Sequence, residues 1–120
     1  MVIRMKPIEL SVEDERLVGQ FAALGNPARL RILEILSRNP ESIVANIVDE
    51  LPLAQATVSQ HLRVLQDAGL IYGDRASGGR CCQIDVAAVS RLAQQVVGWS
   101  LALLSGTCGT AETKGAEWTR

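Results

Sequence analysis

A group of polar residues close together in the chain has side chains suited to contacting DNA: Thr57, Ser59, Gln60 and Arg63. The amide of Gln60 can pair in a bidentate manner with the edge of adenine, and the guanidinium of Arg63 can bind phosphate or guanine. The hydroxyls of Thr57 and Ser59 can reach phosphate oxygens or base edges. These residue types predict contact with duplex DNA, provided that one element presents them on one side.

The segment 53–69 supplies that side, with a helix predicted after a short break at residues 52–54. Val58, Leu62 and Leu65 recur at i, i+4 and i+7, which is the spacing of one apolar helix face. At roughly 100° per residue, the polar group then points away from this face. Gly69 stands where a helix ends on a left-handed residue, so the helix has a defined C-terminus.

Apolar spacing and capping residues predict the elements around this helix. Helices are expected from Ser11 to Gly25, from Asn26-Pro27 to Asn39, over Val44, Val48 and Leu51, and after Asp85, with strands at 70–72 and 82–84. The predicted fold class is mainly α with a small β-hairpin, a winged helix-turn-helix whose fourth helix can enter a major groove. The predicted organisation is an N-terminal arm (1–10), a DNA-binding and dimerisation domain (11–105) and a flexible C-terminal tail (106–120).

The hairpin adds two cations, Arg75 and Arg80, on either side of its predicted turn. A wing of this kind can place both against the DNA backbone or the minor groove. The formal net charge of the whole chain is −1, so any affinity for DNA must come from local patches. Residues 54–80 carry three cations against two carboxylates, a modest local excess of positive charge.

Two apolar faces at opposite ends of the chain predict a homodimer. They consist of Leu17 and Phe21 on the first helix and of Leu92, Val96, Trp99 and Leu103 on the last. Together they exceed what a chain of this length readily covers by itself. The alternative is that the faces close on each other within one chain. A two-fold dimer would also present two recognition helices to successive grooves.

Two segments, 24–33 (LGNPARLRIL) and 56–70 (ATVSQHLRVLQDAGL), closely resemble the ArsR/SmtB family of bacterial repressors. The resemblance covers about residues 17–100. It implies a homodimeric winged-helix protein that binds a palindromic operator and releases it when an inducer docks. The recognition positions of the family fall on Thr57, Ser59, Gln60, His61 and Arg63. Ala54 departs from the family, in which a serine cap is common at this position.

The resemblance also shows which inducer sites of the family are missing. The Cys-x-Cys site falls on Ile43 and Ala45. The zinc-type site of the last helix needs paired Asp/His and His/Glu residues, whereas the only histidine of the chain is His61. We therefore expect His61 to be packed or to contact phosphate rather than to bind metal. A subset of relatives carries a cysteine near Ser42, which would be a lost ligand here.

Three thiols, Cys81, Cys82 and Cys108, remain as candidate inducer ligands. Successive strand residues point to opposite faces, so Cys82, which shares the parity of Ile84, is expected to face inward and Cys81 outward. The leading hypothesis is arsenite, antimonite or another thiophilic metal ion bound by Cys82 with Cys81 or Cys108. No cofactor is expected to be needed for folding.

Other functions remain open for these residues. The thiols could sense oxidants or persulfide, Cys82 could be hydrophobic filling, or the regulator could have no thiol inducer. A winged helix can also bind protein rather than DNA. An enzyme would need Cys82 and His61 as nucleophile and base, and no third group orients them, so none is predicted.

The chain shows no sign of a membrane or of export. No apolar run approaches the ~18 residues needed to cross a bilayer. The first residues interrupt their apolar character with Arg4, Lys6 and Pro7, unlike a secretory signal. An odd number of cysteines also argues against a disulfide framework. We therefore expect a cytoplasmic protein.

Overall fold

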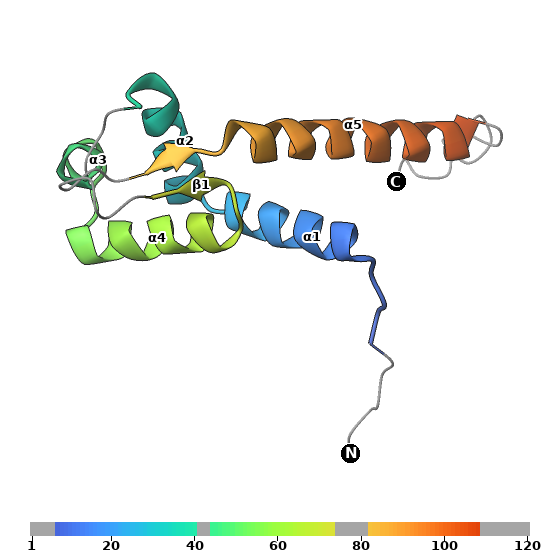
Figure 1. Ribbon diagram of the computed structural model, residues 1–120, viewed down its shortest axis with the longest axis horizontal. Helices are drawn as coiled ribbons and strands as arrows, with labels where there is room; N and C mark the ends of the chain where they lie inside the picture. Colours follow the sequence, from blue (N-terminus) through green and yellow to red (C-terminus); the bar gives the residue numbers. More distant parts are fainter. Residues whose placement is uncertain (1–6, 41–43, 74–81, 109–120) are drawn as a thin grey trace, which may run out of the picture. The chain divides into compact units, whose positions relative to one another are not determined.

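The computed structural model describes residues 7–40, 44–73 and 82–108 (Figure 1). The elements are α1 (Val12–Leu24), α2 (Pro27–Arg38), α3 (Val44–Glu50), α4 (Gln55–Asp67), β1 (Ile71–Tyr72), β2 (Gln83–Ile84) and α5 (Val86–Cys108). The order confirms the predicted fold class, a mainly helical winged helix-turn-helix with a small hairpin. The chain divides into two compact units, the first ending at Val86 and the second starting at Ala87.

Side-chain caps define the starts of the first two helices, as the sequence predicts. The hydroxyl of Ser11 accepts a hydrogen bond from the amide of Asp14 at 3.0 Å. Asn26 Oδ1 accepts from the amides of Ala28 and Arg29 at 2.9 and 3.2 Å, directly before Pro27. These contacts satisfy amides that have no partner within the helix. α4 differs, because Ala54 at its N-cap offers no side-chain acceptor.

The core of the first unit is aliphatic and comes from the inner faces of α2, α3 and α4. Its most deeply buried side chains are Ile32, Ile35, Leu36, Ile47, Val58, Leu65 and Leu70. Of the predicted face, Val44 and Val48 on α3 and Leu51 just after it are half-buried, and the fully buried residue is Ile47, which the pattern left out. Ile47 lies three residues after Val44 and four before Leu51, so it extends the same stripe on one side.

The hairpin is short. β1 and β2 pair antiparallel with Ile71 opposite Ile84 and Tyr72 opposite Gln83. The phenol of Tyr72 donates a hydrogen bond to Gln83 Oε1 at 2.8 Å, and the amide of Asp85 donates to the carbonyl of Leu70 at 2.9 Å. The two segments predicted as strands of the wing therefore pair as an antiparallel hairpin. Its predicted turn, with Arg75 and Arg80, lies outside the described residues.

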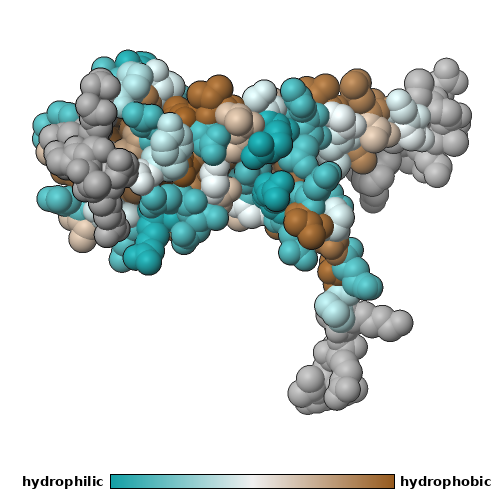
Figure 2. Space-filling view, in the orientation of Figure 1, coloured by the Kyte–Doolittle hydropathy of each residue, from teal (hydrophilic) through white to brown (hydrophobic). Residues whose placement is uncertain are grey.

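The helix α5 exposes many apolar side chains. Leu92 is buried and Val96 half-buried, whereas Trp99 and Leu103 are both 52% exposed and Leu104 is 64% exposed. Figure 2 shows apolar residues at the surface over α5 and around the start of α1. α5 runs to Cys108, two residues past the predicted start of the tail at 106, and residues 109–120 lie outside the described part. None of the described helices combines the length and hydropathy required to cross a membrane.

Gly69 provides a test of the turn that joins α4 to the hairpin. It is the one described residue with positive φ, at 79°, and a Cβ there would meet no atom within 4 Å. We expect Gly69→Ala to lower the free energy of unfolding by about 1 kcal/mol, because only the backbone conformation opposes the new methyl group. Urea denaturation measures this change.

The matched control is Gly19→Ala. Gly19 lies inside α1, with no atom within 4 Å of an added Cβ, and away from the face of Leu17 and Phe21. Since alanine is the better helix former, this variant should gain about 0.5–1 kcal/mol. Equal stability of Gly69→Ala and the wild type would contradict the assignment of a left-handed turn.

Candidate nucleic-acid interface

The helix α4 presents its polar side chains opposite a fully buried face. Val58 and Leu65 are 0% exposed and Leu62 is 6% exposed, with α2 and α3 packed against the helix. Ser59, Gln60 and Arg63 are exposed, and Thr57 is half-buried. The structure therefore places three of the predicted contact residues on the open side of α4 and one at its flank. This side can enter a groove without disturbing the core.

His61 lies at the shoulder of the buried face rather than on the open side. Its ring is half-buried, and Nδ1 is 3.3 Å from Nη1 of Arg29 on α2. The same guanidinium donates hydrogen bonds to the carbonyls of Ala23 and Ala22 at 2.6 and 3.4 Å. These two carbonyls belong to the last turn of α1, and that of Ala22 also accepts a hydrogen bond from the amide of Gly25, the C-cap, at 3.3 Å. Arg29 thus joins α1, α2 and α4.

Gln20 is a second polar link between α1 and α4. Its side chain is 2% exposed, and Nε2 donates a hydrogen bond to the carbonyl of Ala68, the C-cap of α4, at 3.3 Å. The other amide atom, Oε1, is buried and makes no hydrogen bond within the described structure. Burial of a polar atom without a hydrogen bond costs free energy. The hydrogen bond from Nε2 to Ala68 offsets part of this cost and fixes the position of the side chain.

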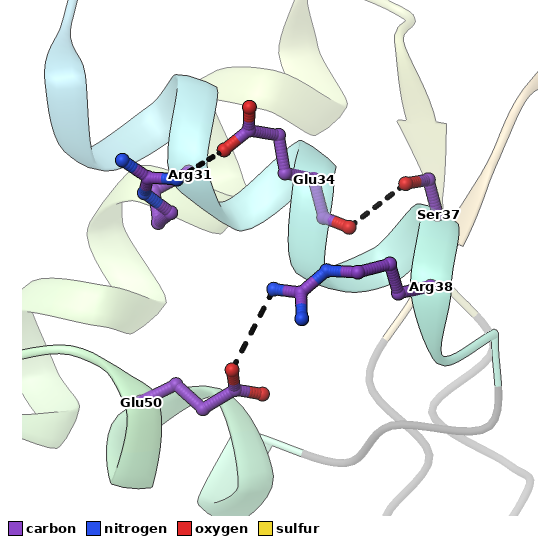
Figure 3. Close-up of polar contacts among 5 residues, drawn as sticks. All are labelled: Arg31, Glu34, Ser37, Arg38 and Glu50. Carbon is purple, nitrogen blue, oxygen red and sulfur yellow. Dashed lines mark hydrogen bonds and ion pairs between the residues drawn. The ribbon is translucent and has the colours of Figure 1, made fainter.

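An ion pair joins the two helices that support α4 from behind. Arg38 Nη2 on α2 lies 3.6 Å from Glu50 Oε1 on α3 (Figure 3). One turn earlier on α2, Arg31 and Glu34 pair at 2.7 Å, and Ser37 Oγ donates to the carbonyl of Glu34 at 2.8 Å. All these groups are largely exposed, so each pair contributes at most about 1 kcal/mol. Of these contacts, the one between Arg38 and Glu50 links α3 to α2.

The candidate thiols are only partly covered by the structure. Cys82, next to β2, is 9% exposed, as expected for an inward-facing residue. Cys81 and Ser42 lie outside the described residues, and Cys108 is the last residue of α5. Within the described part of the chain, no group of three or more His, Cys, Asp or Glu side chains could hold a metal ion.

The buried helix pair, the outward polar face and the paired strands define a winged helix-turn-helix of the DNA-binding regulator class. A family model described as "Bacterial regulatory protein, arsR family" matches residues 26–72, from the N-cap of α2 to the end of β1. A transcriptional regulator of Bacillus subtilis, YbzH, is 31% identical over 103 residues, which cover 74% of this chain and 93% of the relative. The chain belongs to the ArsR family of transcriptional regulators.

Solved structures share the fold. An ArsR-like transcriptional regulator from Rhodococcus sp. RHA1 has a TM-score of 0.66 at 22% identity, covering 79% of this chain and 92% of that one. A possible transcriptional regulator for arsenical resistance has a TM-score of 0.60 at 27% identity, covering 68% of this chain and 83% of that one. The chain spans 50–64% of the length of several other curated relatives, all named as transcriptional regulators. The prediction that the chain is a transcriptional regulator of the ArsR family is confirmed, and none of these relatives is named as an enzyme.

Sequence reasoning missed the two polar links of α4. Gln20 lies between Leu17 and Leu24 on one helix face, and a polar residue inside an apolar face is a signal of burial that could have been followed. Arg29 lies two residues after Pro27 and had no visible partner in the sequence, because its acceptors lie on other helices.

Substitutions on the open side of α4 test the interface. Gln60→Ala and Arg63→Ala are each expected to weaken binding to the specific DNA site by about 1–3 kcal/mol, because each removes hydrogen bonds to a base edge or phosphate. Titration of a labelled promoter fragment at fixed salt measures the change.

Arg31→Ala is the control for the loss of a cation. Arg31 is exposed and paired with Glu34 on α2, so its removal should leave the affinity within a factor of about two, as expected for an exposed ion pair. Equal affinity of the wild type and both α4 variants would remove α4 from the interface.

Proposed function

We propose that this protein is a transcriptional repressor that binds a palindromic operator as a homodimer and leaves it when a soft metal or metalloid binds its thiols. The observation that carries the DNA part is the exposed set of Ser59, Gln60 and Arg63 opposite a fully buried face of α4. A protein held across a promoter by two such helices excludes polymerase from the same DNA, which is the basis for repression.

The homodimer is supported by exposed apolar residues on the helices predicted to form it. Phe21 is 41% exposed on α1, and Trp99 and Leu103 are 52% exposed on α5. Exposed clusters of large apolar side chains are typical of protein–protein interfaces. A second copy with the same faces would cover them by two-fold symmetry and set two α4 helices about one helical turn of DNA apart.

The inducer is supported by the position of Cys82 at the hairpin. A thiolate next to β2 is close in sequence to the wing, so a bound ion there would shift the wing relative to α4 and lower operator affinity. Thiolate prefers soft ions such as arsenite and antimonite. One structural neighbour is described as a possible transcriptional regulator for arsenical resistance, which agrees with this ligand class. The second candidate is a redox or persulfide sensor that uses the same thiols.

A promoter-binding experiment tests the DNA function as a whole. The protein is expected to bind its own promoter fragment at low salt, and log affinity should fall steeply with log salt as phosphate contacts release counterions. A failure to bind at low salt would favour a winged helix that binds protein instead.

The dimer is tested by placing charge on the exposed part of α5. Trp99→Glu and Leu103→Glu should shift the protein toward monomer, because each would bury an unpaired carboxylate in the interface. Sedimentation equilibrium measures the mass. Gln94→Glu, at an exposed polar position of the same helix, is the control and should leave the dimer intact. A wild type that sediments as a monomer at micromolar concentration would refute the dimer.

The thiol inducer is tested on Cys81→Ser, Cys82→Ser and Cys108→Ser. Arsenite, antimonite, zinc, lead and a persulfide donor are added in turn to the protein–DNA complex. We expect arsenite or antimonite to release the wild type and to lose at least tenfold potency on Cys82→Ser, since serine is a poor ligand for soft ions. Release by persulfide alone would select the second candidate, and an unchanged response of all three variants would exclude thiol sensing.

A further inference from the structure

The contact between Arg29 and His61 has only one hydrogen-bonding arrangement. A guanidinium carries donors and no acceptor, so Nδ1 of His61, 3.3 Å from Nη1 of Arg29, must be the acceptor. His61 is then the neutral tautomer with its proton on Nε2. Its Nδ1 lone pair is used inside the protein and is not available to DNA.

Arg29 is itself held on two other sides. Its Nε and Nη2 donate to the carbonyls of Ala23 and Ala22 in the last turn of α1, at 2.6 and 3.4 Å. Its own backbone amide is bound by the Asn26 cap at the start of α2. The planar fork of the guanidinium therefore has a fixed orientation before it reaches α4. His61 docks α4 onto a donor whose position two helices have already determined.

We propose that His61 is a positioning residue, which sets the orientation of α4 by accepting a hydrogen bond from Arg29 at Nδ1. The proposal rests on the proposed DNA-binding function and assigns one of the predicted contact residues a different role. Burial of Val58, Leu62 and Leu65 determines which face of α4 is inward. The Arg29–His61 hydrogen bond lies near the middle of α4, next to Gln60. Unlike apolar packing, a hydrogen bond depends on direction, so it restrains the orientation of the helix.

Two amide substitutions separate the roles of the two ring nitrogens. Asparagine places its carbonyl oxygen close to where histidine has Nδ1, whereas the longer glutamine places its amide close to Nε2. If His61 acts through Arg29, His61→Asn retains promoter affinity within about threefold of the wild type. His61→Gln and His61→Leu lose affinity roughly tenfold, because each loses one hydrogen bond to a charged group. If His61 donates to phosphate through Nε2, the order of Asn and Gln is reversed, which would overturn the proposal.

Urea unfolding of the same variants without DNA gives a second readout. The equilibrium constant for unfolding should rise about tenfold in His61→Gln and remain near the wild-type value in His61→Asn. A phosphate contact predicts no such difference in the absence of DNA, so equal stability of the two variants would also overturn the proposal. Circular dichroism checks that each variant is folded before its affinity is compared.

Arg29→Lys tests the donor. Lysine keeps the charge but lacks the fork that reaches three acceptors at once, so the difference between His61→Asn and His61→Gln should shrink in this background. An undiminished difference would overturn the role of Arg29. Binding of the wild type to its promoter is measured in parallel. Its absence would refute the proposed function, whereas the unfolding measurements would still decide the Arg29–His61 bond.

Discussion

Burial of one face of α4 is the constraint on which the rest of the first unit depends. Val58, Leu62 and Leu65 are almost fully removed from water, and each contributes roughly 1.5–3 kcal/mol by its burial. A rotation of α4 that exposed these three side chains would lose more free energy than a hydrogen bond on the outer side of the helix could provide. The exposure of Gln60 and Arg63 is therefore a consequence of packing, and the polar links of Gln20 and Arg29 refine an orientation that the core has already selected.

Charge alone explains little of how such a protein would recognise DNA. The chain has a net charge of −1, and two cations of α2, Arg31 and Arg38, are engaged with carboxylates on α2 and α3. Along α4, Arg63 is the only arginine or lysine. In the proposed complex, recognition therefore relies on directional hydrogen bonds from Gln60 and its neighbours, and on the second copy of the proposed dimer.

Local patterns predicted most of the fold. Caps such as Asn26-Pro27 and the turn glycine Gly69 act within a few residues, so the helix bounds follow from the sequence. The polar links could not be predicted in this way, because Gln20 and Ala68 are 48 positions apart, and Arg29 and His61 are 32 apart. The apolar period of 3.6 residues predicted which side of α4 is open. The contact of His61 could not be predicted, because it depends on which helix packs against α4 at that position.

The division of the chain after Val86 has a consequence for how the protein is made. Synthesis proceeds from the N-terminus, and domains generally fold as units in that order. All helices that bury α4 and both strands of the hairpin precede α5 in the chain. The helix α4 and the elements that bury it therefore emerge from the ribosome before α5 does. The fold of the DNA-binding unit does not have to wait for a second polypeptide.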